Sequence, residues 1–442
     1  MAESLTDTLS TALQPVQVAD VLEPIFSKLF SGPPPLTFEF WDGSQLRADG
    51  PGRITMHNRQ ALRRILWSPD QLGLSRAFIS GDLGAEGNVA TVLRTLQQSM
   101  PSERRIALHA LPEVIAATRT FGGIGKPPPP PPEEVVPRGI RHSLQRDRQT
   151  VGHHYNTGND FYRLVLGPTM TYSCARFATA ETTLEAAQEA KHELICRKVG
   201  LAEDPPEHDK PRRRKRVLDV GCGWGSMAIH AATKHDVEVV GVTLSEEQAK
   251  YARQRIDEVG LGDRVEIRVQ DYREVDDGPF DAISSIGMAE HVGRKNMAQY
   301  FKQMYSLLRP GGRMLNHAIS SVGGSRLPRR SFVNRYVFPD GELLDVGVTA
   351  LVMERAGFEI RDVENLREHY ASTLRQWVAN LEDSWDEAVK LVGEARARIW
   401  LLYMSGSVNG FDDGGLQLNQ TLGVRPHSGG RSDMPPTRSG WG

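Results

Sequence analysis

Between Arg216 and Ser321, short apolar runs alternate with stretches of helical spacing, and this pattern constrains the fold more than any other feature of the chain. It predicts strands over 216–220, 237–244, 264–272, 280–286 and 313–321, and helices over 226–235, 245–260 and 297–312, the last ending at a Pro-Gly-Gly stop. Strands that follow one another through helices form a parallel sheet with helices packed on it. The sequence therefore predicts an α/β fold for this part of the chain.

Six consecutive prolines, Pro127 to Pro132, mark the clearest boundary in the chain. Such a run is stiff and extended, and we expect it to act as a spacer outside any packed core. Before it, apolar and polar residues alternate from Thr37 to His57, which predicts strands joined by turns. The predicted parts are a smaller α+β accessory domain at 1–125, a linker at 126–138, a larger domain at 139–423, and a disordered tail at 424–442, which is rich in Gly, Ser, Pro and Arg.

The charge balance excludes one class of partner. The chain has 53 Lys and Arg against 55 Asp and Glu, a net charge of −2, and it lacks the basic excess of proteins that bind nucleic acid. Its cysteines, Cys174, Cys196 and Cys222, are too few and too scattered for a disulfide framework and indicate a reducing compartment. The N-terminus lacks the pattern of a secretory signal, and no window approaches the roughly 18 consecutive apolar residues of a membrane-spanning helix. We therefore expect a cytoplasmic protein.

The densest local signal is the turn Gly221-Cys222-Gly223-Trp224-Gly225, directly after the first predicted strand. Glycines allow a tight turn and a close approach of the backbone to a ligand at the start of a helix. The dinucleotide fingerprint GxGxxG would place its last glycine at Ser226, whereas this chain has GxGxG with Asp219 before it. An acidic residue at this position suits the ammonium group of S-adenosylmethionine (SAM). SAM carries no phosphate, unlike a dinucleotide. The pattern favours SAM over NAD, and a strand–turn–helix without a ligand is the remaining alternative.

Two further strand ends are expected at the same edge of the sheet, where ligands bind in doubly wound folds. The second strand ends at Thr243 and Leu244, and the third at Gln270, Asp271 and Tyr272. Asp271 is placed to accept a hydrogen bond from an exocyclic amine such as that of adenine, with Tyr272 packed on the ring. The alternative for Asp271 is a cap of a helix or a turn.

Several longer motifs are spread over most of the chain. They are FWDGSQL, FISGDL, HHYNTGNDFYRLVLGPTMTYSCARF, VLDVGCGWGSMAI, VVGVTLSEEQ, VQDYREV, GMAEHVG, NHAISS, YVFPDGELL and HYASTLRQW. Together they resemble the cyclopropane-fatty-acyl-phospholipid synthases, whereas generic methyltransferases share only the glycine turn. The resemblance implies a class I SAM-methyltransferase fold, which is a Rossmann-like α/β sheet of seven strands, with a smaller N-terminal domain.

The resemblance also implies the residues of the site. Those expected to meet SAM are Tyr172, Ser173, Gly221, Gly223, Thr243, Leu244 and Gln248, with Asp271 and Tyr272 beside the adenine, and the strand-end residues Asp219 and Gln270 complete the set. The implied base is a bicarbonate ion, held by residues matching Cys174, Glu290, His317, Ile319 and Tyr370. Cys174 and Ile319 would contribute mainly backbone groups. No metal is expected at this site.

The chemistry that the resemblance implies is consistent with these residue types. An alkene is a weak nucleophile with no proton to lose before attack, so a Ser-His or Cys-His pair is not required. Methyl transfer from the SAM sulfonium leaves a carbocation on the acyl chain, which aromatic faces can stabilise. A small held base then removes one proton. Proton loss from the new methyl group closes a cyclopropane, whereas a hydride shift before that loss leaves a methylene, the precursor of a methyl branch.

Two positions depart from the family pattern and leave the product open. Ala289 stands where many members carry a bulky aromatic residue, and Asn419 stands where a tryptophan is common. The methylene-forming actinobacterial relatives, which make the precursor of 10-methyl stearate, therefore stay beside the ring-forming branch. Methylation of nitrogen or oxygen on another acceptor, and lipid binding without catalysis, are the rival functions. Taken alone, Tyr370 would be a core aromatic residue and Cys174 a candidate nucleophile.

A phospholipid substrate implies contact with a membrane from the water side. We expect peripheral contact at the inner face of the plasma membrane, with 1–125 as a lipid-facing domain. The basic run Pro211–Arg216 offers attraction to anionic headgroups, at roughly 1 kcal/mol per basic residue near the surface, and its alternative is a solvated loop flank. A homodimer and a partner reductase that completes the product are further expectations.

Overall fold

The chain divides into two compact units. The computed structural model describes residues 16–99, 111–121, 125–135, 158–202, 213–323, 328, 330–339 and 341–441. Unit 1 is Met1–Pro132 and unit 2 is Glu133–Gly442, so the division falls inside the segment predicted as a linker. Residues 136–138 of that segment and residues 153–157 of the long HHYNTG motif lie outside the described residues.

Unit 1 combines a small sheet with helices, as predicted for the N-terminal α+β domain. Its strands are β1 (Thr37–Glu39), β2 (Gln45–Leu46), β3 (Arg53–Met56) and β4 (Leu83–Glu86), in the order β2-β1-β3-β4. Its described helices are α1 (Val18–Phe30), α2 (Arg59–Trp67), α3 (Gln71–Ile79), α4 (Val89–Ser99) and α6 (Leu111–Phe121). Phe26 of α1 packs edge-on against Phe38 and Phe40, with ring centroids 4.5 and 6.1 Å away. The apolar face of α1 therefore forms part of the core of unit 1.

The proline run is held against unit 1 and is not a free spacer. Nη1 of Arg64 on α2 donates a 2.6 Å hydrogen bond to the carbonyl of Pro129, and Nη2 of Arg63 donates one of 3.0 Å to the carbonyl of Lys126. Pro131 is buried. Prolines cannot donate from their backbone, but their carbonyls remain acceptors, and Arg64 uses that of Pro129. The expectation that the run stays outside packed structure was wrong for this part of the linker.

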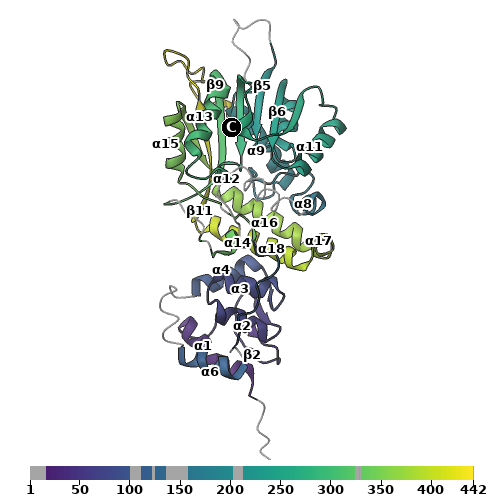
Figure 1. The fold of residues 1–442 in the computed structure, drawn as a ribbon, viewed down its shortest axis with the longest axis vertical. Helices are drawn as coiled ribbons and strands as arrows, with labels where there is room; N and C mark the ends of the chain where they lie inside the picture. The colour runs from purple at the N-terminus through teal and green to yellow at the C-terminus, as the bar shows by residue number, and fades with distance from the viewer. Residues whose placement is uncertain are drawn as a thin grey trace, which may run out of the picture. The chain divides into compact units, whose positions relative to one another are not determined.

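Unit 2 is built on a seven-stranded sheet, which confirms the predicted fold class (Figure 1). The strands are β5 (Lys215–Val220), β6 (Val237–Thr243), β7 (Val265–Val269), β8 (Phe280–Ile286), β9 (Leu308–Ser321), β10 (Glu359–Asn365) and β11 (Leu416–Val424). Their order is β10-β11-β9-β8-β5-β6-β7, and β5 pairs in parallel with both β6 and β8. The chain order reverses at β5, which makes the carboxyl end of β5 the switch point where such sheets bind ligands.

Two helical layers cover the sheet of unit 2. On one face, α9 (Leu184–Lys198), α10 (Ser226–Lys234) and α11 (Glu246–Glu258) contribute to one apolar core cluster. On the other face, α13 (Met297–Leu307) and α15 (Val346–Ala356) contribute to a second cluster. Figure 1 shows α13 and α15 on the opposite side of the strands from α11.

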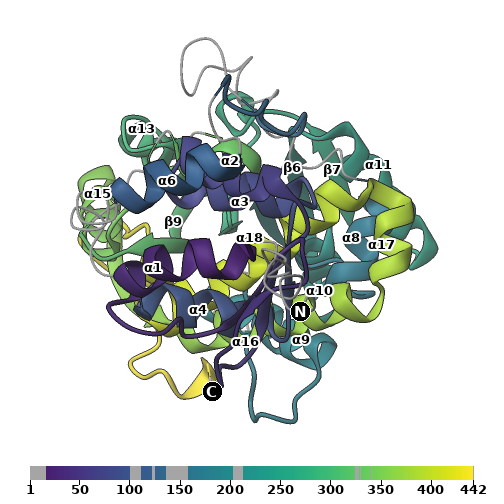
Figure 2. The ribbon, with the colours of Figure 1, turned by 90° about the horizontal axis from the view of Figure 1, so that it is seen from below.

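Further helices extend unit 2 beyond the strand ends. They are α8 (Asn159–Leu166), α12 (Ala289–Val292), α14 (Phe332–Tyr336), α16 (Arg367–Asp383), α17 (Trp385–Val392) and α18 (Glu394–Asp412). The helix α8 lies against α16 and α17 (Figure 2). The helix α16 packs along α18, and both contact β11. The helices between β10 and β11 thus pack beside the sheet.

The Pro-Gly-Gly sequence lies inside a strand, so its prediction as the stop of a helix was wrong. The helix α13 ends at Leu307, and β9 begins with Leu308. The register against β8 shifts from Phe280 opposite Leu308 to Ala282 opposite Arg313, which leaves an irregularity that holds the extra residues. Gly311 has φ 78°, and a Cβ at Gly312 would lie 2.8 Å from the carbonyl oxygen of Arg309. The glycines allow this bulge because only they fit its backbone.

The predicted disordered tail is packed against unit 2. The strand β11 reaches Val424, and Nη1 of Arg425 donates to the carbonyls of Leu308 and Tyr305, at 2.6 and 3.0 Å. Trp441 is only 8% exposed and joins the apolar cluster that contains α9. The prediction of disorder for 424–442 was therefore wrong over the described residues to Trp441, because the hydrogen bonds of Arg425 and the burial of Trp441 hold the segment.

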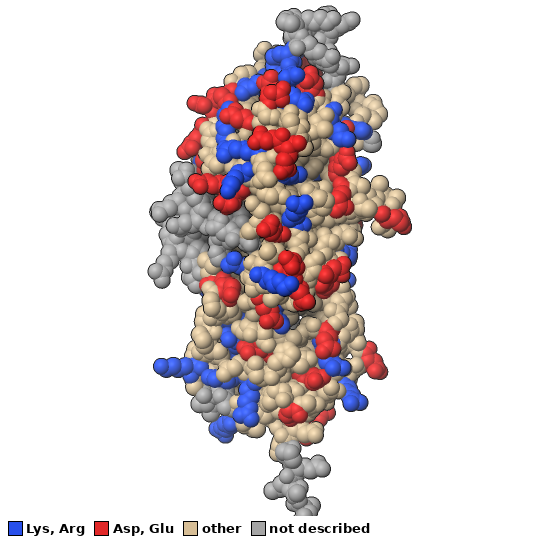
Figure 3. Space-filling view, turned by 90° about the vertical axis from the view of Figure 1, so that its right-hand side faces the viewer, with Lys and Arg blue, Asp and Glu red and all other residues tan. Residues whose placement is uncertain are grey.

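In the described part of the basic run, Arg213 and Arg214 are each paired with an acidic side chain. Arg213 pairs with Asp281 at 2.8 Å, and Arg214 pairs with Asp236 at 2.8 Å. These arginines precede β5 and so lie at the opposite edge of the sheet from the carboxyl ends of its strands. The described part of the face in Figure 3 carries both signs of charge interspersed. Among the described residues, no helix is long and apolar enough to cross a membrane.

Candidate active site

One pocket lies at the carboxyl ends of β5, β6 and β7, at the switch point of the sheet. All eleven residues predicted to meet the cofactor line it: Tyr172, Ser173, Asp219, Gly221, Gly223, Thr243, Leu244, Gln248, Gln270, Asp271 and Tyr272. They come from three successive strand ends, from α11 and from the segment before α9. The sequence thus predicted a set of residues that the fold brings together around one cavity.

The glycine turn after β5 follows a backbone path that other residues rarely adopt. Gly221, Gly223 and Gly225 have φ of 76°, 54° and 80°. A Cβ at Gly221 would lie 3.3 Å from the sulfur of Met288, which also lines the pocket. The turn therefore needs glycine both for its conformation and for the close approach of its neighbours.

Asp219, the last residue but one of β5, is a fully buried carboxylate at the pocket wall. Its Oδ1 accepts a 2.7 Å hydrogen bond from the Ser284 hydroxyl, while Oδ2 has no partner among the described residues. Burial raises the pKa of Asp219 to about 6, although the bond from Ser284 and the nearby Lys191 act in the opposite direction. A buried carboxylate with one free oxygen is suited to a cationic group of a ligand.

Lys191 of α9 is a pocket residue that the sequence analysis did not identify. Its side chain is completely buried, and Nζ donates a 3.0 Å hydrogen bond to Ser173 Oγ. Burial lowers the pKa of Lys191 to about 7, and the neighbouring Cys174 and Asp219 oppose that shift. No motif marks this lysine, because α9 carries charged residues along its whole length and only the fold shows which one turns inward.

The ends of β6 and β7 arrange polar groups around the pocket. Thr243 Oγ1 donates a 3.0 Å hydrogen bond to Gln248 Oε1. Asp271 accepts 2.7 Å bonds from Nε and Nη2 of Arg273, and its Oδ1 also caps the short helix that begins at Tyr272. The cap predicted for Asp271 is confirmed, and the same carboxylate lines the pocket, while its contact with adenine stays a prediction.

An aromatic wall stands on the side of the pocket that the TYSC segment forms. The ring of Tyr172 lies 5.4 Å from Trp377 and 5.8 Å from Trp400, measured between centroids. Tyr162 packs 5.9 Å from Tyr172 and 4.7 Å from Trp224. Rings packed in this way exclude water and offer negative faces toward a cation.

Two of the five predicted catalytic residues are joined directly. Glu290, at the start of α12, accepts a 2.7 Å hydrogen bond at Oε1 from the backbone N–H of Ile319 on β9. Its other oxygen, Oε2, is buried without a partner among the described residues. Burial raises the pKa of Glu290 to about 7, against the bond from Ile319. The carboxyl group is therefore close to half protonated at neutral pH.

His317 lies two residues before Ile319 on β9 and is also fully buried. Its Nδ1 lies 3.3 Å from Gln420 Nε2 on β11, and its Nε2 has no partner among the described residues. Burial, together with Lys191, holds the pKa of His317 well below its usual range, so the ring is neutral. With the Gln420 amide donating to Nδ1, the ring proton resides on Nε2 and makes that atom a donor.

Cys174 and Tyr370 meet at a shared backbone group. Cys174 Sγ lies 3.7 Å from the carbonyl of Leu366, and the backbone N–H of Tyr370 donates to the same carbonyl at 3.1 Å. Burial raises the pKa of the Cys174 thiol, so the thiol stays protonated and is a poor nucleophile. The Tyr370 ring packs 4.6 Å from Phe411 and 6.1 Å from Trp377, which belongs to the aromatic wall.

The catalytic group lies next to the cofactor pocket and is not part of its lining. Gly287 and Met288 line the pocket, Glu290 follows two residues later, and the N–H of Gly287 donates a 2.9 Å bond to the carbonyl of His317. The departure at Asn419 also lies here, since its Nδ2 donates a 2.7 Å bond to Ser320 Oγ. The other departure, Ala289, is buried at the start of α12.

The sheet order, the glycine turn and the acidic strand ends together define a class I SAM-dependent methyltransferase. The family model described as "Mycolic acid cyclopropane synthetase" matches residues 142–421. The chain belongs to this family of cyclopropane synthases, as the motifs indicated.

Similar proteins extend over the whole chain. A probable fatty acid methyltransferase of Mycobacterium tuberculosis is 40% identical over 96% of this chain and 98% of its own length. The tuberculostearic acid methyltransferase UfaA1 of the same organism is 32% identical over 88% of each chain, and the cyclopropane-fatty-acyl-phospholipid synthase of Escherichia coli is 39% identical over 61% of this chain and 66% of its own.

A solved structure with a similar fold contains the product form of the cofactor, SAH. The mycolic acid cyclopropane synthase CmaA1 in complex with SAH and CTAB matches with a TM-score of 0.57 and 32% identity, over 62% of this chain and 98% of that one. The chain is therefore a SAM-dependent methyltransferase of the fatty acid and cyclopropane type. This excludes the nicotinamide oxidoreductase that the glycine turn alone left open.

Proposed function

We propose that the chain transfers the SAM methyl group to the cis double bond of an unsaturated, oleoyl-type acyl chain on a membrane phospholipid. The observation that carries this proposal is the buried polar group beside the pocket, in which Glu290 Oε2 and His317 Nε2 lack partners among the described residues. Buried polar atoms are rarely left unpaired, so these two indicate a small polar species between them.

The residues present fit a bicarbonate ion. Glu290 in its protonated form, the Nε2–H of His317 and the Tyr370 hydroxyl would hold it, with backbone groups at Cys174 and Ile319. When bound, bicarbonate supplies a base for the proton that the methylated acyl chain must lose. A carboxyl group with a pKa of about 7 is suited to share a proton with such an ion. The neutral His317 donates without adding a positive charge beside the carbocation.

The other residues of the site orient and protect the reaction. Asp219 would bind the ammonium group of SAM, and Asp271 and Tyr272 would hold the adenine. The aromatic rings of Tyr172, Trp377 and Trp400 would keep water away and stabilise the cation on the acyl chain. Proton loss from the new methyl group gives a cyclopropane, and loss after a hydride shift gives a 10-methylene chain.

The remaining expectations concern the setting of the reaction. The acyl chain has to be taken from the inner face of the plasma membrane, and unit 1 would provide the lipid-facing surface. The partners of Arg213 and Arg214 leave the basic run as a poor contact for headgroups, so the membrane contact would lie elsewhere. A methylene product would require a partner reductase to become a methyl branch, and the enzyme would act as a homodimer.

The test is lipid analysis after incubating the purified chain with SAM and vesicles of dioleoyl phospholipid. Acyl chains are released and measured by gas chromatography–mass spectrometry, before and after hydrogenation that distinguishes a ring from a methylene. We expect a one-carbon gain on oleoyl chains, and none on vesicles of dipalmitoyl phospholipid, which contain no double bond. Free oleate, tested in parallel, shows whether the phospholipid is required.

Binding of SAM without any one-carbon gain on unsaturated lipid would overturn the proposal and favour a different acceptor. To test the base, the reaction is repeated in buffer freed of carbon dioxide and then with added bicarbonate. We expect activity to fall in the first case and to return in the second. Activity that is independent of bicarbonate would show that the ion is not the base. The proposal that an unsaturated acyl chain is the acceptor would not be affected.

A further inference from the structure

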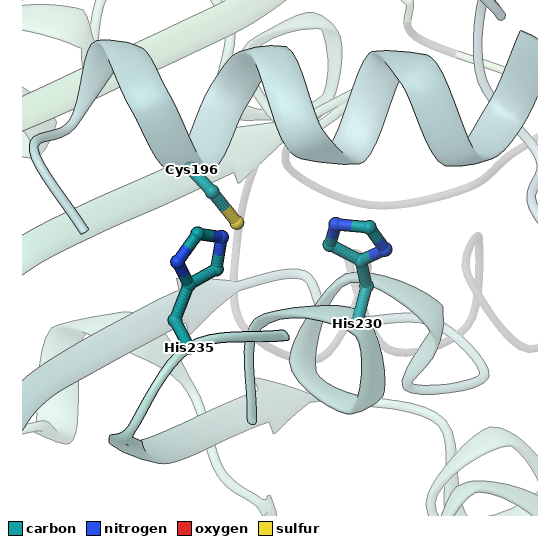
Figure 4. A group of neighbouring side chains, drawn as sticks. All are labelled: Cys196, His230 and His235. Atoms are coloured by element: carbon teal, nitrogen blue, oxygen red, sulfur yellow. The ribbon is translucent and has the colours of Figure 1, made fainter. Parts of the chain in front are cut away.

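Three side chains with metal-binding atoms meet behind the cofactor pocket. Cys196 comes from α9, His230 from α10, and His235 from the residue that ends α10. One donor atom of each, Sγ or a ring nitrogen, lies within 4.8 Å of the other two. Figure 4 shows the thiol pointing from its helix toward the two rings. None of the three was part of the predicted site, and none lines the pocket.

Glu193 lies against the two rings but is not one of the three grouped donors. It lies one turn before Cys196 on α9, and its Oε2 lies 3.3 Å from His230 Nε2 and 3.1 Å from His235 Nε2. Its Oε1 accepts a 2.8 Å bond from Arg197 Nε, which fixes the carboxylate and leaves Oε2 toward the rings. The Nε2 atoms of both rings therefore already face one carboxylate oxygen.

The burial of these side chains favours a bound ion. Cys196 is completely buried, and the side chains of His230 and His235 are only 8% and 11% exposed. Neutral imidazole and thiolate are ligands that zinc prefers.

We propose that Cys196, His230 and His235 bind one zinc ion, with Glu193 held beside the two rings. Binding releases the proton of the Cys196 thiol, because the thiolate is the ligand. The ion takes no part in methyl transfer.

The position of the site indicates what the ion does. It joins α9 to α10, and both helices line the SAM pocket with other residues, namely Lys191 and His192 of α9 and Ser226 and Met227 of α10. The rings of His192 and His230 lie 5.6 Å apart, so the site and the pocket wall are neighbours. The ion would fix the spacing of the two helices and thereby the shape of the pocket.

The test uses the full chain, produced without a polyhistidine tag, treated with a chelator and dialysed. Cobalt(II) is titrated first, because a cobalt–thiolate bond gives a charge-transfer band, and zinc is then added as a competitor. We expect one ion per chain, a thiolate band that zinc removes, and a rise in Tm with zinc. Cys196→Ser should lose the band, and His235→Gln should weaken binding at least tenfold.

Two control variants match these changes outside the cluster. His427→Gln removes a histidine that pairs with Asp433, and Cys222→Ser removes another buried cysteine. Both should keep the band and the affinity. If Cys196→Ser does not fold, as judged by circular dichroism, the partly exposed His235→Gln still decides the question. Absence of binding to the wild-type chain would overturn the proposal, and so would cobalt binding that survives both Cys196→Ser and His235→Gln.

Discussion

The cofactor pocket and the catalytic group are neighbours in unit 2 but are built in different ways. The pocket is formed largely by a continuous part of the chain, from Asp219 to Tyr272, at three successive strand ends, and its shape depends on backbone such as the turn at Gly221. The catalytic group gathers side chains and backbone from α12, β9, α16 and the segment before α9. A site of the first kind spreads its binding energy over many contacts. A site of the second kind depends on a few buried polar atoms.

The cofactor pocket and the catalytic group also differ in their electrostatics. In the pocket, the carboxylate of Asp219 is ionised at neutral pH and remains near a buried lysine, Lys191. In the catalytic group, burial brings the pKa of Glu290 to about 7 and keeps His317 neutral. The pocket is thus prepared for a cation, and the catalytic group is prepared to exchange a proton. Substitutions in the two regions should therefore affect different measured quantities.

The largest effect is expected for Glu290→Gln. Removing the carboxyl group that holds the base should lower turnover by about 10³-fold, within the range of general acid–base catalysis, and should change SAM affinity less than twofold. Turnover is measured on oleoyl vesicles and SAM affinity by calorimetry. Glu382→Gln on α16 is the matched control, since burial also raises the pKa of that carboxyl group, and its turnover should stay unchanged. Equal losses in turnover and affinity would show that the two regions are not separable.

The same variant has a signature in stability. The folded pKa of Glu290, about 7, lies above the ordinary value of 4.5, so its contribution to the free energy of unfolding is full below pH 4.5 and is lost as pH rises through 7. Glu290→Gln should therefore be more stable than wild type at pH 8, by roughly 3 kcal/mol, and gain little at pH 4.5. Denaturation at the two pH values measures this difference.

Asp219→Asn should change SAM affinity and leave turnover nearly intact, which is the opposite of the pattern expected for Glu290→Gln. Loss of a buried charge that faces the SAM ammonium group should weaken SAM binding by about 10²-fold, because truncating a buried charged partner costs roughly 3 kcal/mol, while turnover at saturating SAM stays within threefold. In the wild type, SAM affinity should fall as pH decreases through 6, where Asp219 takes up a proton. In Asp219→Asn this pH dependence should be absent. A variant that binds SAM normally but turns over slowly would place Asp219 in the catalytic group.

The sequence predicted the two regions unequally well, for physical reasons. Strand ends of a parallel sheet meet at one edge, so periodicity and the glycine turn were enough to assemble much of the pocket. No such rule brings Glu290, His317 and Tyr370 together, and their roles came from the family resemblance alone. Lys191 was missed because burial of one lysine on a charged helix leaves no sequence signal, and the Pro-Gly-Gly bulge and the tail anchored by Trp441 were missed because both depend on tertiary contacts.

Lys191→Met tests the boundary between the two regions, because Lys191 lies near both Asp219 and Cys174. Losing its bond to Ser173 should reduce SAM affinity and turnover by about tenfold each, as expected for a hydrogen bond to a charged group. The variant should also melt at a higher temperature than wild type. The unfolded chain holds the lysine proton up to pH 10.5 and the folded chain only to about 7, so the cost of burial is full below pH 7 and vanishes as pH approaches 10.5.

The measurement is the difference in Tm between Lys191→Met and wild type at pH 6.5 and at pH 9.5. The gain should be large at the lower pH and much smaller at the higher one. Lys390→Met, at an exposed position on α17, is the control and should show no gain at either pH. If the gain in Tm is the same at both pH values, the difference in stability between the two proteins comes from packing and not from the buried charge.

The smallest effect is expected for Asp271→Ala, at the adenine side of the pocket. Its carboxylate caps the turn at Tyr272 and is bound by Arg273, so its removal frees the arginine and loosens the ring that should face the adenine. SAM affinity should weaken about fivefold, the cost of one ordinary hydrogen bond, and turnover at saturating SAM should not change. Asp271→Asn keeps the cap and should recover part of the affinity. If SAM affinity is unchanged in Asp271→Ala, Asp271 only caps the turn, and the cofactor pocket extends no further than the ends of β5 and β6.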